Sequence, residues 1–159
     1  MTEKLKELGI RLPEPFATMG SYVPAVLAGD LLFVAGHPPA EHGKIKFKGK
    51  VGKDITIDEG RQAAELCMIN CLAAAQAALG DLDRIERAVK VTGYVNCLGD
   101  FEKQPDVING ASDLLEKIWG ERGRHARAAV GTISLPANIA VEVEVIFKVK
   151  TKDGKSPQW

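Results

Sequence analysis

Hydrophobic and polar positions follow two different periods along the chain. Residues 21–36 contain two apolar runs around a Gly-Asp dipeptide, a two-residue turn that predicts a β-hairpin. Residues 56–80 carry apolar side chains at helical spacing, between a capping-box start and a glycine stop. A second helical stripe runs from a first-turn proline to a glycine over residues 105–120. The pattern therefore predicts a hairpin followed by two amphipathic helices.

The remaining apolar segments alternate with the period of a strand. Valines at every second position predict one strand over residues 88–96, between the two helices. Residues 125–136 and 140–150 predict two strands that pair with each other, and residues 44–52 predict a short surface ribbon. The order β-β-(β)-α-β-α-β-β predicts an α+β fold with two helices on one face of a mixed sheet.

The chain length of 159 residues fits one domain. Prolines near residues 13–15 suggest an N-terminal arm over residues 1–20, followed by a single domain over 21–150 and a polar tail over 151–159. Tyr94 and Ile146 fall on the sheet face that the two helices would leave open. An open face with apolar side chains predicts a partner, and a closed homo-oligomer is the usual one.

Charge and composition narrow the class of protein. Lys and Arg together number 21, as do Asp and Glu, so the net charge is zero and no nucleic-acid partner is expected. The apolar runs are far shorter than the roughly 18–20 residues that span a bilayer, so no membrane partner is expected. The first residues are charged where a signal peptide would be apolar. We expect a soluble, cytoplasmic protein.

The cysteines and histidines show no metal-ligand spacing, so no metal is expected. Cys67, Cys71 and Cys97 fit buried structural thiols better than a disulfide or zinc site. Nucleotide-binding and serine-hydrolase signatures are absent as well.

One arginine stands out as a candidate ligand-binding group. Arg127 lies near the start of a predicted strand among small alanines, which leave room for its planar guanidinium to bind a carboxylate. A surface arginine is the simpler interpretation. Glu142 and Glu144 share one side of the last strand. If that strand pairs with the Arg127 strand, a carboxylate could lie near the guanidinium. There it would either form a salt bridge or orient a water molecule. Tyr22 and Asn109 offer neutral hydrogen-bonding groups or purely structural ones.

Two motifs make the sequence resemble a known family over roughly residues 20–150. The C-terminal motif reads Ala126-Arg127, Ala129-Val130, Leu135-Pro136 and Val141-Glu142-Val143-Glu144, and the N-terminal motif reads Tyr22, Gly29-Asp30 and Val34-Ala35-Gly36. The chain resembles the Rid family, also called YjgF-type or endoribonuclease L-PSP-like, whose namesakes are reactive imine deaminases. With its arm, a 41–53 insert and its tail it resembles a longer subgroup.

The resemblance implies a chorismate-mutase-like fold, a homotrimer and three ligand clefts between subunits. It implies that Arg127 binds the carboxylate of a small 2-imino acid and that Glu142 holds the attacking water. Tyr22, Asn109 and Ala129 would line the cleft, and the Gly36 region would supply backbone hydrogen bonds. The products would be a 2-oxo acid and ammonia, and no metal or organic cofactor would be required.

Three departures from the family pattern keep alternatives open. Ala129 stands where the best-known deaminases often have cysteine, His125 where the family has proline, and His37 where it usually has glutamine. The protein is therefore a possible imine or enamine deaminase, a hydrolase of C=N bonds. The alternative is non-catalytic binding of small carboxylates such as 2-oxo acids in the same cleft. RNA cleavage or translation inhibition is disfavoured by zero net charge and the lack of a histidine pair.

Overall fold

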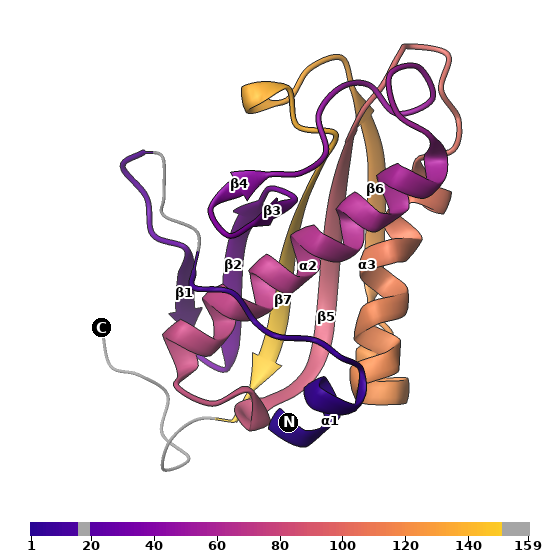
Figure 1. The fold of residues 1–159 in the computed structure, drawn as a ribbon. Helices are drawn as coiled ribbons and strands as arrows, with labels where there is room; N and C mark the ends of the chain where they lie inside the picture. Colours follow the sequence, from indigo (N-terminus) through magenta and orange to yellow (C-terminus); the bar gives the residue numbers. More distant parts are fainter. Residues whose placement is uncertain (16–19, 151–159) are drawn as a thin grey trace.

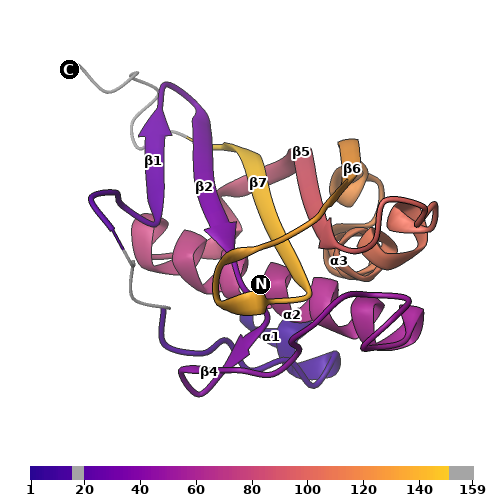
Figure 2. The same cartoon turned by 90° about the horizontal axis from the view of Figure 1, so that it is seen from above.

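The computed structural model describes residues 1–15 and 20–150. They form a five-stranded sheet with two long helices on one face (Figures 1 and 2). The helices are α1 (Thr2–Glu7), α2 (Ile57–Leu79) and α3 (Gln104–Trp119), with 3-10 turns η1 (Leu82–Arg84), η2 (Gly120–Gly123) and η3 (Pro136–Asn138). The strands are β1 (Ala25–Ala28), β2 (Leu31–His37), β3 (Ala40–Glu41), β4 (Lys44–Ile45), β5 (Ile85–Asn96), β6 (Ala126–Thr132) and β7 (Val141–Val149). The predicted α+β class and helix-on-one-face arrangement are confirmed.

The sheet has the order β1-β2-β7-β5-β6, and only the β5–β6 pair is parallel. The predicted hairpin is present: β1 and β2 pair antiparallel across Gly29-Asp30, and Gly29 adopts a φ of +62°, which glycine reaches without a steric penalty. A register shift between Val34 and His37 marks a bulge at the end of β2.

The predicted pairing of the last two strands is wrong. β6 pairs in parallel with β5, and β7 lies between β2 and β5 (Figure 1). The physical reason is the α3 crossover: a strand that follows β5 through a helix returns parallel to it and occupies one of its edges. The other edge of β5 is then left for β7. A carboxylate on β7 therefore does not face the β6 arginine across one strand pair.

Helix α2 lies close against β7. Thr56 caps its N-terminus in a reciprocal capping box with Glu59, as predicted, and Gly80 ends the helix in the left-handed conformation. The Cys67 and Cys71 thiols are buried and donate to backbone carbonyls of β7 at 3.4 and 3.2 Å. All three cysteines are free and buried.

The predicted surface ribbon lies earlier than expected. The structure pairs β3 with β4 around His42-Gly43, and both turn residues have positive φ. Residues 48–56 instead form a loop, which Lys50 anchors. Its ammonium donates to Asn96 Oδ1 at 3.0 Å, to the Cys97 carbonyl at 3.4 Å and to the Ile133 carbonyl. This lysine joins the loop to the ends of β5 and β6.

The first residues pack against the domain. Leu5 of α1 is buried in the core, and the N-terminal ammonium pairs with Asp83 at 2.7 Å. The predicted tail, residues 151–159, lies outside the described residues, as do residues 16–19 of the predicted arm. No helix in the described part of the chain has the length and apolar character needed to cross a membrane.

Candidate functional site

A hydrogen-bonded cluster surrounds Arg127 between β6 and α3. The Arg127 Nη1 group donates to Asn109 Oδ1 at 2.8 Å and to Ser112 Oγ at 3.1 Å, and Nη2 donates to the Pro105 carbonyl at 3.4 Å. The structure thus brings together two of the predicted site residues, Arg127 and Asn109. Ser112 joins them as a residue that was not predicted.

The guanidinium has only neutral acceptors around it. Arg127 is partly buried, and among residues 1–15 and 20–150 no carboxylate lies within ion-pair distance of it. The neighbouring carboxylates are engaged elsewhere, since Asp113 pairs with Arg61 and Glu116 pairs with Arg124 at 3.0 Å. A partly desolvated cation without a counter-charge attracts an anionic ligand.

The rotation of α3 explains why its polar residues reach β6. Asn109 and Ser112 are three residues apart and therefore share one helix face. Gly110 packs so tightly on α2 that a Cβ there would lie 2.0 Å from the Arg61 carbonyl oxygen. This contact fixes which face of α3 meets α2 and leaves the Asn109–Ser112 face beside β6. A pocket of about 400 Å³ opens at this position, lined in part by both residues and Arg127.

A second group of polar residues lies around Glu142 on β7. Gly36 on β2 approaches it so closely that a Cβ at residue 36 would lie 2.2 Å from Glu142 Oε1. Burial, and then the nearby Glu144 carboxylate, raise the pKa of Glu142 above its usual range. Tyr94 on β5 donates to Glu144 at 3.4 Å. A raised pKa makes a carboxylate a better proton acceptor than an exposed glutamate.

The register places Arg127 and Glu142 on opposite faces of the sheet. Val91 of β5 is the cross-strand partner of Arg127, whereas Tyr94 is the partner of Glu142. Side chains alternate between the faces along a strand, so residues 91 and 94 point in opposite directions. Arg127 consequently lies on the helix-covered face, and Glu142 lies on the open face.

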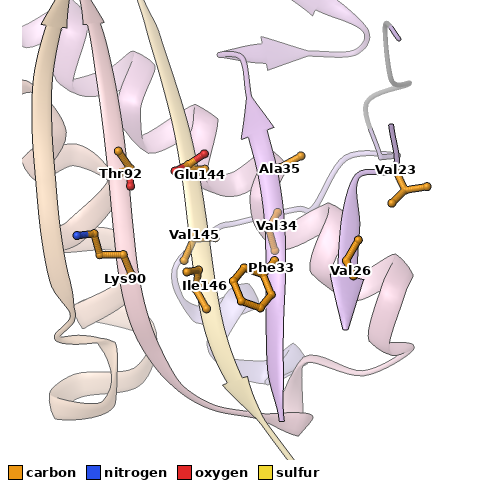
Figure 3. Close-up of a pocket in the computed structure, with 10 residues that line it drawn as sticks. All are labelled: Val23, Val26, Phe33, Val34, Ala35, Lys90, Thr92, Glu144, Val145 and Ile146. Atoms are coloured by element: carbon orange, nitrogen blue, oxygen red, sulfur yellow. The ribbon is translucent and has the colours of Figure 1, made fainter. Parts of the chain in front are cut away.

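The open face carries a shallow groove of about 300 Å³. Figure 3 shows Lys90, Thr92 and Glu144 on its β5 and β7 side, with Phe33 and Val26 on its β2 and β1 side. Phe33 and Val26 are 42% and 46% exposed, which is high for large apolar side chains on a sheet. The groove therefore combines polar groups on β5 and β7 with apolar side chains on β1, β2 and β7.

His37 does not belong to either polar group as a titrating residue. Its side chain is buried at the end of β2, and its Nε2 atom has no hydrogen-bond partner within the described residues. Burial lowers the pKa of His37 to about 4. The ring is therefore neutral at physiological pH.

Comparison with known proteins identifies the family. The protein-family model described as "YjgF/chorismate_mutase-like, putative endoribonuclease" matches residues 2–148 of the chain. The chain belongs to the YjgF, or Rid, family. The resemblance in its two sequence motifs is thereby confirmed.

Similar proteins from other organisms cover most of the chain. Protein TCP17 of Trypanosoma cruzi is 42% identical over 146 residues, covering 91% of this chain and 91% of the relative. RutC family protein PH0854 of Pyrococcus horikoshii is 31% identical over 134 residues, covering 84% and 89%. The crystal structure of Atu1372 from Agrobacterium tumefaciens, described as a protein with unknown function, is 47% identical with a TM-score of 0.87, covering 93% and 91%.

The residues that the Rid resemblance selected lie in separate places within the chain. Arg127 and Asn109 meet beside α3, and Gly36 and Glu142 meet on the open face. Ala129 is partly buried on β6, on the same side of the strand as Arg127 and packed against the core. Tyr22 precedes β1 and is 52% exposed. No single pocket of the described residues holds all of them.

Sequence reasoning missed the part that Ser112 and His125 play beside Arg127. His125 precedes Arg127 by two residues, the strand period, and Ser112 follows Asn109 by three, the helix period. These two spacings were the available signal, but only the α3–β6 contact shows that they converge. Within the described chain no three His, Cys, Asp or Glu side chains cluster closely enough to hold a metal ion.

Proposed function

We propose that this protein hydrolyses small 2-imino acids, or the related enamines, to 2-oxo acids and ammonia. The observation that carries the proposal is the Arg127 guanidinium, which is partly buried and, among the residues that the structure describes, bound only by neutral acceptors of Asn109, Ser112 and Pro105. Three of its five N–H groups are used, which leaves Nε–H and one Nη2–H. Two donors on neighbouring nitrogens match the two oxygens of a carboxylate.

The position of Glu142 supports an active site shared between subunits. Arg127 and Glu142 lie on opposite faces of one sheet, so a single subunit does not present both to one small ligand. We propose a homotrimer in which the β6 edge of one subunit, which carries Arg127, packs against the open face of the next, which carries Glu142. The exposed apolar residues of the open face supply surface for this packing.

The chemistry requires little from the protein beyond positioning. In the substrate iminium, R–C(=NH2+)–COO−, the carbon is already electrophilic. A water held by Glu142 attacks that carbon, and the carboxylate takes one of its protons. The proton then returns to the nitrogen of the resulting carbinolamine, the C–N bond breaks and ammonia leaves. The hydroxyl gives its proton to the Glu142 carboxylate as it becomes the carbonyl of the 2-oxo acid, and the released ammonia or solvent takes that proton away. The raised pKa of Glu142 suits a group that must both accept and return a proton.

The remaining site residues have positioning roles in this proposal. Asn109 holds Arg127, and the absence of a side chain at Gly36 makes space for the Glu142 carboxylate. Tyr22 and Ala129 line the cleft formed with the neighbouring subunit. The reaction needs no metal or organic cofactor. The buried free thiols fit a reducing compartment such as the cytoplasm.

A coupled assay tests the proposal. An amino-acid dehydratase or oxidase generates short-lived 2-imino acids while semicarbazide traps those that remain. We expect the protein to divert imine to 2-oxo acid and Arg127→Ala to lose this activity. Arg122→Ala removes an exposed arginine of the same segment and is the matched control, expected to retain activity.

Inactivity of both the native protein and Arg127→Ala across several imino acids would contradict the deaminase proposal. Binding of a stable 2-oxo acid by the inactive native protein would then favour the non-catalytic alternative. The endoribonuclease in the family's description is not proposed for this chain, because its net charge is zero. RNA binding that weakens with salt would contradict that choice.

A further inference from the structure

A chain of hydrogen bonds that the proposed reaction does not use ends at Arg127. His125 Nδ1 lies 2.7 Å from the Gly123 carbonyl oxygen, and His125 Nε2 lies 3.0 Å from Ser112 Oγ. Ser112 Oγ in turn accepts from Arg127 Nη1 at 3.1 Å. Four groups are therefore linked in a row, from η2, from the residue just before β6, from α3 and from β6.

The direction of this chain follows from its fixed end. A backbone carbonyl only accepts, so the hydrogen on His125 must be on Nδ1. Burial lowers the pKa of His125; the hydrogen bond to Gly123 opposes this effect, and the nearby Arg127 charge adds to it. The net lowering favours the neutral ring at neutral pH. Neutral Nε2 then accepts, and Ser112 must donate its hydroxyl hydrogen to it. The Ser112 lone pairs are left facing the guanidinium.

The fixed end is itself immobilised by packing. Gly123 is buried, and a Cβ there would lie 2.1 Å from the Leu115 carbonyl oxygen on α3. The carbonyl that orients His125 is thus held against the same helix that carries Ser112. The row of hydrogen bonds is therefore anchored on α3, beside the pocket.

We propose that Ser112 and His125 are positioning residues that hold the Arg127 guanidinium with Nε–H and one Nη2–H directed at the ligand carboxylate. With Ser112 oriented by His125, Nη1 has two fixed acceptors, Ser112 and Asn109. The guanidinium then has one preferred orientation before the ligand arrives, which reduces the ordering cost of binding. The inference rests on the proposed function for the nature of the ligand. It adds the residues that orient the Arg127 guanidinium before the carboxylate binds.

Removing either residue should weaken carboxylate binding with little effect on the chemical step. For Ser112→Ala and His125→Phe we expect KM for 2-imino acids to rise about tenfold, while kcat stays within about twofold. The dissociation constant of pyruvate, a stable 2-oxo acid, should rise by the same factor in titration calorimetry. Ser112→Thr keeps a hydroxyl and should bind like the native protein. Ser134→Ala removes an exposed serine from the β6–β7 connection and serves as the matched control.

A spectroscopic readout is independent of activity. In ¹⁵N spectra of histidine-labelled protein at neutral pH, His125 should be protonated at Nδ1 and unprotonated at Nε2. Protonation at Nε2 would overturn the inference, because Ser112 could not then donate to that nitrogen.

The outcomes separate the two proposals. If Arg127→Ala weakens pyruvate binding but Ser112→Ala and His125→Phe do not, the positioning inference fails while the proposed function stands. If Arg127→Ala itself changes neither binding nor turnover, the proposed function fails and the inference fails with it.

Discussion

Gly36→Ala should lower the rate of imine hydrolysis while leaving the free energy of unfolding almost unchanged. The added Cβ would lie 2.2 Å from Glu142 Oε1, 2.9 Å from Cδ and 3.1 Å from Cγ. Restoring ordinary contact requires the carboxylate to retreat by about 1 Å. A misplacement of that size at a reacting group lowers kcat/KM by about 100-fold, which corresponds to about 2.7 kcal/mol of transition-state stabilisation.

The stability of Gly36→Ala should hardly change. The clashing atoms are the end of a flexible side chain, and alanine in a strand is favoured over glycine by about 0.5–1 kcal/mol. We expect urea unfolding to give a free energy within about 1 kcal/mol of the native value. The imine assay and the unfolding curve are measured on the same preparation.

Gly131→Ala provides the matched control for crowding. A Cβ at Gly131 would lie 2.8 Å from Gln104 Nε2 and 2.9 Å from Cys97 Sγ, away from Glu142. It should cost stability and leave kcat/KM largely intact. Native kcat/KM in Gly36→Ala would refute the reasoning, because the Glu142 carboxylate would then have moved without consequence for the reaction.

Three further predictions concern groups outside the reaction. In the folded protein the pKa of His37 is lowered from 6.5 to about 4, so the unfolded chain takes up a proton first as the pH falls. The free energy of unfolding should therefore drop by about 3 kcal/mol between pH 6.5 and 4. His37→Phe should lack this contribution in acid unfolding curves. Lys50→Met should lose about 2 kcal/mol in urea unfolding because three acceptors lose a charged donor, whereas the exposed control Lys53→Met should be near neutral. The three cysteines should resist dithiobis(nitrobenzoate) in the native protein and all react after unfolding; fast native labelling would contradict their burial.

The predicted elements were those whose signals are local. The Thr56 capping box, the Gly29-Asp30 turn and the alternation of β7 each depend on a few neighbouring residues, and each is present in the structure. Pairing between strands depends on the whole chain. The predicted β6–β7 pair failed because the α3 crossover returns β6 to the edge of β5.

The same distinction applies to the site. Arg127 and Glu142 were selected by motif, but their placement on opposite faces follows from the register of β5 with both neighbours, which no local pattern encodes. Ser112 and His125 were not recognised as a pair because their contact joins two elements. The close packing of Gly110 on α2 and of Gly123 on α3 accompanies their contact.

The most direct test of the shared active site is to mix two inactive variants. Arg127→Ala and Glu142→Gln are coexpressed, and the mixed oligomers are assayed for imine hydrolysis. If Arg127 of one subunit acts with Glu142 of the next, about a quarter of the clefts in random trimers regain both groups, and activity returns to that level. If both residues act within one subunit, or if neither takes part, no mixture exceeds the activity of its parents, and the account is contradicted.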